Sequence, residues 1–160
     1  MAVRNLTCVI IGCALALWMG VGRWLFGIGG ELTIWYLPLI AIPYALLQLW
    51  TVRRFRIAAD RGRRVGRAPF VALILSWVCA LGFGFTVPDL VGGELVSILS
   101  HLAGPEWLEM SIALCNPFGI VAFTTAIIAL AFAAAAGREP RAEEDDADVE
   151  GGMVSHPLEH

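Results

Sequence analysis

The chain has 160 residues, of which 58% are hydrophobic and 16% are charged. Soluble domains carry about 25% charged residues, so this composition excludes an ordinary soluble domain and favours a membrane protein. The net charge of −3 is a poor guide to partners, because arginines and carboxylates are segregated along the chain.

Four apolar stretches are long enough to cross a bilayer, which takes about 20 residues in a helix. They span residues 5–22, 32–52, 69–88 and 112–137. We therefore predict an all-α integral membrane protein with a four-helix transmembrane domain over residues 1–137. Ile10–Cys13 resembles a lipoprotein cleavage box, so a cleaved signal is the rival interpretation of the first stretch. The chain stays apolar well past Cys13, which favours a span.

Small residues recur at four-residue spacing in each span, which lets helix backbones approach closely. They are Gly12, Ala16 and Gly20, then Ala41 and Ala45, then Ser76, Ala80 and Gly84, and finally Ala122, Ala126, Ala129, Ala133 and Gly137. These positions predict packing seams, either within one chain or between chains.

The first connection carries Arg23 and Glu31 at the two ends of a glycine-rich turn. We expect these two residues to form a polar pair across the turn, or to contact the third connection, residues 89–111.

Prolines interrupt the second and fourth spans. Pro38 and Pro43 each remove a backbone donor, so we expect a bent second helix. Asn116-Pro117 predicts a break in the fourth, with its main part beginning at Phe118. Broken helices often line transport sites, so these residues are the candidates for a helix break or a pore.

The connection over residues 53–67 is rich in arginine, with Arg53, Arg54, Arg56, Arg61, Arg63, Arg64 and Arg67. With four spans, ten of the eleven arginines fall on one side and only Arg23 on the other. This bias places both termini in the cytoplasm of a bacterial cell, as a multi-pass inner-membrane protein. We expect the seven arginines to contact anionic headgroups. An acidic protein segment is the alternative partner, and nucleic acid is not favoured because no aromatic stacking platform accompanies the arginines.

The third connection, residues 89–111, predicts two short interfacial helices. Leu95, Ile98, Leu99 and Leu102 have helical spacing, and a second helix would begin at Pro105. His101, Glu106 and Glu109 are the candidate metal ligands, since imidazole and carboxylates bind divalent cations. Solvated side chains or a partner contact are the competing interpretations.

The segment 138–157 is acidic and predicted to be a disordered cytoplasmic tail. Residues 158–160 resemble the start of a histidine tag and are set aside.

No nucleophile triad, phosphate loop or zinc spacing occurs, so we predict no catalytic residue and no cofactor. The leading hypothesis is a non-enzymatic accessory or assembly subunit of a membrane complex, with a protein partner. A homo-oligomeric channel or facilitator is the first alternative. A membrane enzyme or metal-binding protein that uses its outer-face residues is the second.

Overall fold

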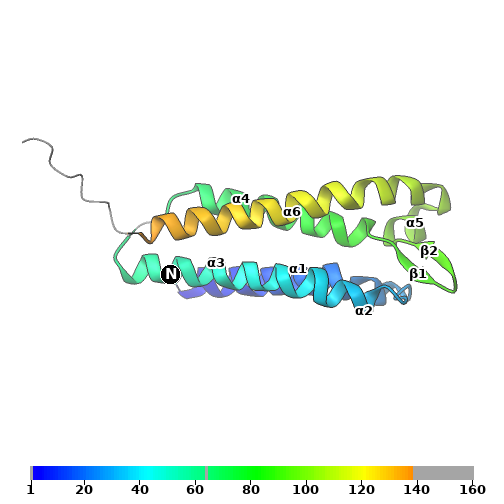
Figure 1. Ribbon diagram of the computed structural model, residues 1–160, viewed down its shortest axis with the longest axis horizontal. Coiled ribbons are helices and arrows are strands. Elements are labelled where there is room, and N and C mark those ends of the chain that lie inside the picture. The colour runs from blue at the N-terminus through cyan, green and yellow to red at the C-terminus, as the bar shows by residue number, and fades with distance from the viewer. Residues whose placement is uncertain (1, 64, 139–160) are drawn as a thin grey trace, which may run out of the picture.

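The computed structural model describes residues 2–63 and 65–138 (Figure 1). Arg64, the acidic segment beyond Arg138 and residues 158–160 lie outside the described residues. Four helical segments are long and apolar enough to cross a membrane: Arg4–Phe26, Thr33–Asp60, Ala68–Thr86 and Pro105–Ala136. They suggest a multi-pass helical membrane protein.

The four long helices form an antiparallel bundle. They are α1 (Ala2–Val21), α3 (Ile42–Asp60), α4 (Ala68–Thr86) and α6 (Leu108–Ala136). Figure 1 shows α4 beside α6 and α1 beside α3, and contacts of α3 with α6 and of α1 with α4 complete the bundle. We call its two ends the arginine end, with Ala2, residues 61–67 and Arg138, and the hairpin end, with strands β1 and β2.

The small-residue seams lie inside the bundle, as expected for packing within one chain. Ala16, Ala80 and Ala126 are at most 2% exposed. A Cβ at Gly12 would lie 2.8 Å from the Cβ of Gln48, and one at Gly84 would lie 2.1 Å from Trp18 Nε1. Small residues therefore set the close approach of α1 to α3 and of α1 to α4.

The second span is irregular where its prolines lie. After the short α2 (Thr33–Tyr36), the π-helical segment η2 (Leu37–Ala41) leads into α3. Pro38 and Pro43 lack the N–H groups that a regular helix would use there, so the chain takes one wider turn between them.

The expected break at Asn116-Pro117 is wrong in one respect, because α6 continues through Pro117 without a change of element. A proline inside a helix removes one hydrogen bond, and packing against a neighbouring helix can offset that loss in a spanning helix. Gly119, two residues after Pro117, supplies such packing: a Cβ there would lie 3.1 Å from the ring of Phe83.

The arginine-rich connection is shorter than expected. Helix α3 runs to Asp60, so Arg53, Arg54 and Arg56 are helical and only residues 61–67 connect α3 to α4. Arginine and alanine, which make up most of residues 53–59, have high helix propensity, which favours the extension.

The third connection begins with a hairpin, which corrects the prediction of a helix starting at Leu95. Strands β1 (Asp89–Val91) and β2 (Glu94–Val96) pair antiparallel, with Asp89 opposite Val96. Gly92 and Gly93 both have positive φ, which a two-residue hairpin turn requires and which glycine adopts freely. The short α5 (Ile98–Ala103) and the 3-10 turn η3 (Pro105–Trp107) follow.

Candidate functional site

A buried ion pair joins the end of the first helix to the hairpin. Arg23 lies in the 3-10 turn η1 (Gly22–Phe26), Asp89 begins β1, and both side chains are fully buried. Arg23 Nε donates to Asp89 Oδ2 at 3.1 Å, and Nη2 donates to the Gly20 carbonyl at 2.9 Å. A buried charge at the edge of an apolar span is tolerated when it is paired, so this contact fixes the hairpin to α1.

The Asp89 carboxylate has both oxygens satisfied. Oδ1 accepts from the N–H groups of Leu32 and Leu90, each at 2.8 Å, and Oδ2 accepts from the Thr33 hydroxyl at 2.7 Å as well as from Arg23. Burial alone raises the pKa of Asp89. Hydrogen bonds from Thr33 and the neighbouring backbone outweigh burial, so this pKa lies below its ordinary value. The carboxylate is therefore charged at neutral pH.

The linker between η1 and α2 lies against the β1 edge of the hairpin. Glu31 N–H donates to the Leu90 carbonyl at 3.1 Å, and the Tyr36 hydroxyl donates to the Pro88 carbonyl at 2.9 Å. A Cβ at Gly30 would lie 2.0 Å from the Leu90 oxygen, so no side chain fits there. The linker thus covers one edge of the hairpin.

Arg23 is held on a third side by an aromatic ring. Its guanidinium carbon lies 4.6 Å from the centroid of the Tyr36 ring, a cation–π distance. Within the described residues, Arg23 Nη1 has no hydrogen-bond partner. The pair and the bonds from Arg23 to Gly20 and from Leu32 and Thr33 to Asp89 join η1, the linker and β1, so the arrangement serves as a structural clamp.

A cluster of buried hydroxyls fixes α5 at the same end. Ser97 and Ser100 form a capping box at the start of α5. Ser111 Oγ lies 2.7 Å from Ser97 Oγ and 2.8 Å from the Thr86 carbonyl oxygen. The cluster therefore connects α4, α5 and α6, and with the ion pair it makes the hairpin end a fixed platform.

The structure distinguishes the two expectations for Arg23. Glu31 is exposed and contributes only its backbone N–H, whereas Arg23 pairs with Asp89 in the third connection. The pairing across the glycine-rich turn is therefore wrong and the contact with the third connection is right. Two positions along the chain from Glu31, Thr33 supplies the hydroxyl that completes the site.

Acid should weaken the clamp at Asp89. Its folded pKa is depressed, so its contribution to stability is full above the unfolded value of about 3.9 and is lost as pH falls through the folded pKa. The melting temperatures of the wild type and of Asp89→Asn are measured from pH 7 to pH 2. We expect the difference between them to shrink below about pH 4. A difference that stays constant to pH 2 contradicts this assignment.

The three candidate metal ligands are not gathered into one site. Among the described residues, no group of three His, Cys, Asp or Glu side chains is placed to hold a metal ion. His101, Glu106 and Glu109 are exposed. His101 lines a pocket with Glu94, while the Glu106 carboxylate lies over Gly104.

Strand β2 has an edge to which no described residue forms a hydrogen bond. Leu90 of β1 directs its backbone groups outward to the linker, so its partner Leu95 directs its own outward on the opposite edge. Leu95 is 41% exposed. Beside it lies a pocket of about 510 Å³, lined by Glu94, Leu95, Val96, Ser100, His101, Pro105 and Leu108.

Polar side chains inside the bundle bond to one another. Tyr44 Oη lies 2.8 Å from Ser76 Oγ, which donates to the Ala122 carbonyl at 2.7 Å. Gln48 accepts from Trp77 Nε1 at 3.2 Å. These contacts join α3 to α4 and α4 to α6.

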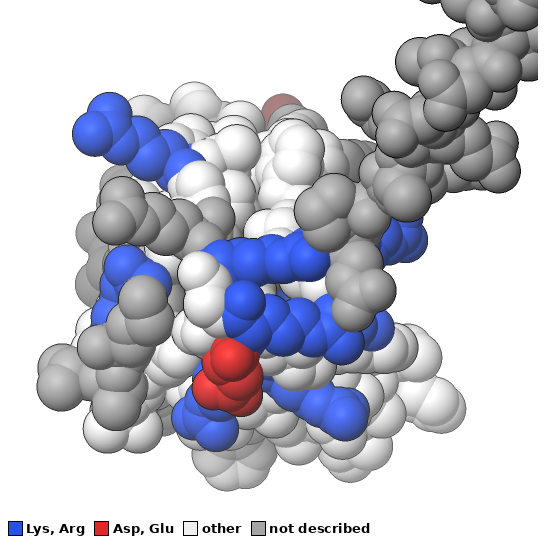
Figure 2. All heavy atoms as spheres, turned by 90° about the vertical axis from the view of Figure 1, so that its left-hand side faces the viewer, with Lys and Arg blue, Asp and Glu red and all other residues white. Residues whose placement is uncertain are grey.

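The other predicted site residues lie on the outside of the bundle. Asn116 and Pro117 are exposed on α6, and Asn116 lines a hollow of about 330 Å³ together with Ile40 of η2. Six of the seven arginines of residues 53–67 are described, and most are exposed at the arginine end. Figure 2 shows arginines spread over that end, with a small acidic patch among them.

Sequence reasoning gave Asp89 no role of its own, although two signals pointed to it. Arg23 is the lone basic residue of its side, and Asp89 is the first charge after the third span. The Gly92-Gly93 pair between short apolar runs is likewise a hairpin signal.

No protein-family model matches the chain, and neither a curated protein nor a solved structure is significantly similar to it.

Proposed function

We propose that the protein resides in the bacterial cytoplasmic membrane with its arginine end in the cytoplasm. Ten of the eleven arginines belong to that end by sequence, and Arg23, the remaining one, is buried in an ion pair. Short connections rich in arginine stay on the cytoplasmic side during insertion. In this orientation the hairpin end faces the outer side, and the exposed arginines meet the anionic headgroups of the inner leaflet.

We infer that the protein is a non-enzymatic accessory or assembly subunit that docks a partner protein on its hairpin end. The open β2 edge beside the pocket carries this proposal. An unpaired edge can accept an extended segment of another chain through main-chain hydrogen bonds, while the adjacent pocket receives its side chains. The clamp at Asp89 and the Ser97 cluster preorganise this edge, which reduces the cost of ordering it on binding.

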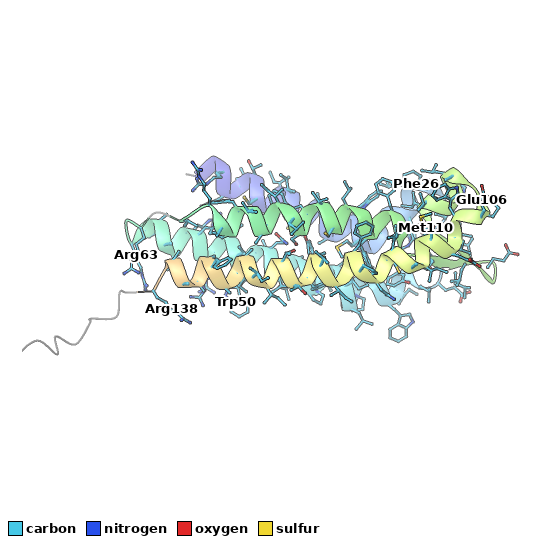
Figure 3. The ribbon with its side chains drawn as sticks, turned by 90° about the horizontal axis from the view of Figure 1, so that it is seen from above. Phe26, Trp50, Arg63, Glu106, Met110 and Arg138 are labelled. Carbon is cyan, nitrogen blue, oxygen red and sulfur yellow. The ribbon has the colours of Figure 1, made fainter. Side chains whose placement is uncertain are left out.

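The charge at the hairpin end indicates the chemistry of the partner segment. Glu31, Glu94, Glu106 and Glu109 are exposed there, and Figure 3 shows Glu106 at the extremity of the bundle. The one arginine described at this end is Arg23, which is buried and already paired. Charge complementarity therefore favours an extended segment that carries lysine or arginine.

The test compares two substitutions at Leu95. Leu95→Pro removes the outward N–H of β2, and an edge strand tolerates proline where its N–H faces solvent. Leu95→Thr keeps the N–H and changes only the side chain. We expect a stoichiometric partner protein to co-purify with the wild type and with Leu95→Thr, and to be lost from Leu95→Pro.

Two outcomes contradict this docking mode. Equal recovery of the partner with both variants excludes pairing through the β2 edge. Glu94→Gln/Glu106→Gln removes two negative charges from the hairpin end. If this variant recovers as much partner as the wild type, the partner segment is not recognised by its basic residues.

A homo-oligomeric channel or facilitator is the second candidate, and the exposed Asn116 favours it. A polar side chain that faces lipid is unfavourable, so a second copy could cover the hollow that Asn116 and Ile40 line. Ion or solute flux in liposomes that disappears in Asn116→Leu would support this candidate. Flux that persists in this variant would exclude the site.

A further inference from the structure

The arginine end contains a polar pocket between α3 and α6. Its volume is about 240 Å³, and it is lined by Arg54, Ile57, Arg61, Ala134, Gly137 and Arg138. Three of these six residues are arginines, contributed by α3, the connection after it and the end of α6. The Arg61 guanidinium donates to the Gly137 carbonyl and so caps the C-terminal end of α6.

The pocket has an excess of positive charge. Among the described residues no acidic side chain lines it, and Asp60 is the one acidic residue described at this end. Arg54 and Arg138 form no side-chain hydrogen bond or ion pair with any described residue, and Arg61 bonds only to a neutral carbonyl. Three like charges around one cavity repel each other, so an anion placed among them is stabilised by all three.

The pocket lies at the end of the fourth candidate span, close to where a bilayer would present its phosphate groups. The fourth candidate span ends at Ala136, one residue before the pocket's Gly137. On α3, nearer the middle of the bundle, an apolar hollow of about 340 Å³ is lined by Leu46, Leu49, Trp50 and Arg53. Trp50 is one turn before Arg54 on the same helix face, and tryptophan favours the membrane interface. Figure 3 shows Trp50 farther from the end of the bundle than Arg138.

We propose that this pocket binds the phosphate of one anionic phospholipid, with an acyl chain lying along the apolar hollow at Trp50. The proposal concerns one defined site, and it differs from the general attraction of exposed arginines to headgroups. Arg53, Arg56, Arg63 and Arg67 lie outside this pocket, whereas Arg138, from the end of α6, belongs to it. Guanidinium groups from α3, from the connection after it and from the residue after the C-cap of α6 can bind phosphate with several charge-assisted hydrogen bonds.

The test is native mass spectrometry of the full chain released from bilayers that contain phosphatidylglycerol and phosphatidylcholine. We expect one phosphatidylglycerol molecule to remain bound to the wild type. In Arg54→Gln/Arg138→Gln its affinity should fall about fivefold for each arginine removed. The control is Arg56→Gln/Arg67→Gln, which changes the net charge equally with exposed arginines outside the pocket and should retain the lipid.

Several results would overturn the proposal. Equal loss of lipid in both double variants would show general charge attraction without a site. Equal retention of the two lipids by the wild type would exclude recognition of the anionic one. Lipid bound only after truncation beyond Arg138 would show that the acidic tail occupies the pocket. If inorganic phosphate raises the melting temperature as much as phosphatidylglycerol does, the pocket binds a soluble anion and not a lipid.

Discussion

Replacing Asp89 with asparagine will lower the free energy of unfolding by about 3–5 kcal/mol, because it leaves the Arg23 charge buried without its partner. Asparagine keeps the shape of the side chain but loses the charge that Arg23 requires. Its amide nitrogen replaces one of the two accepting oxygens, so the bond from Leu32 or the bond from Thr33 loses its acceptor. Thermal or chemical unfolding in detergent, followed by circular dichroism, measures the loss.

Two further variants identify the cause of that loss. Glu31→Gln removes a charge from the same end without touching the ion pair, so its effect should stay within about 0.5 kcal/mol. Arg23→Met/Asp89→Leu removes both charges and should recover part of the stability, since buried pairs can often be replaced by apolar residues. A larger effect of Glu31→Gln than of Asp89→Asn would contradict the pairing.

Replacing Ala126 with leucine will destabilise the bundle by about 1–3 kcal/mol, because the added methyl groups have no room in the seam of α6. Ala126 is 1% exposed and belongs to the core cluster that contains Met19, Tyr44 and Phe83. The matched control is Ala131→Leu, the same substitution at an exposed position of the same helix. Unfolding is measured as for Asp89→Asn. The control should lose no more than about 0.5 kcal/mol of the free energy of unfolding.

Similar effects of the two alanine substitutions would mean that the seam of α6 does not set the packing within one chain. A change of oligomeric state in Ala131→Leu alone would instead place an interface between copies on the exposed face of α6.

The spans and the seams could be predicted because they depend on local composition. An apolar stretch of sufficient length predicts a span whatever its neighbours are, and small residues four apart share one helix face. Both signals are therefore visible in a single sequence. Whether the helix continues through Pro117 depends instead on packing around Gly119, which lies against Phe83 of another helix. That contact is not visible in the local sequence.

The clamp could be predicted only in part, because its partners lie far apart along the chain. Arg23 and Asp89 are separated by 66 positions, so the sequence indicates that Arg23 needs a partner without identifying it. The hairpin was missed for a different reason. Leu95, Ile98 and Leu102 fit a helical spacing, and short apolar runs fit more than one element. The positive φ of Gly92 and Gly93 decided the outcome in favour of a turn.

We propose that the protein works by docking a partner chain at its hairpin end. Native mass spectrometry of the protein, extracted gently from its own membranes, tests that claim most directly. We predict that the wild type forms a complex with a stoichiometric foreign protein and that the Leu95→Pro variant lacks this protein. A discrete homo-oligomer with no foreign protein would contradict the docking claim and would favour a channel or facilitator.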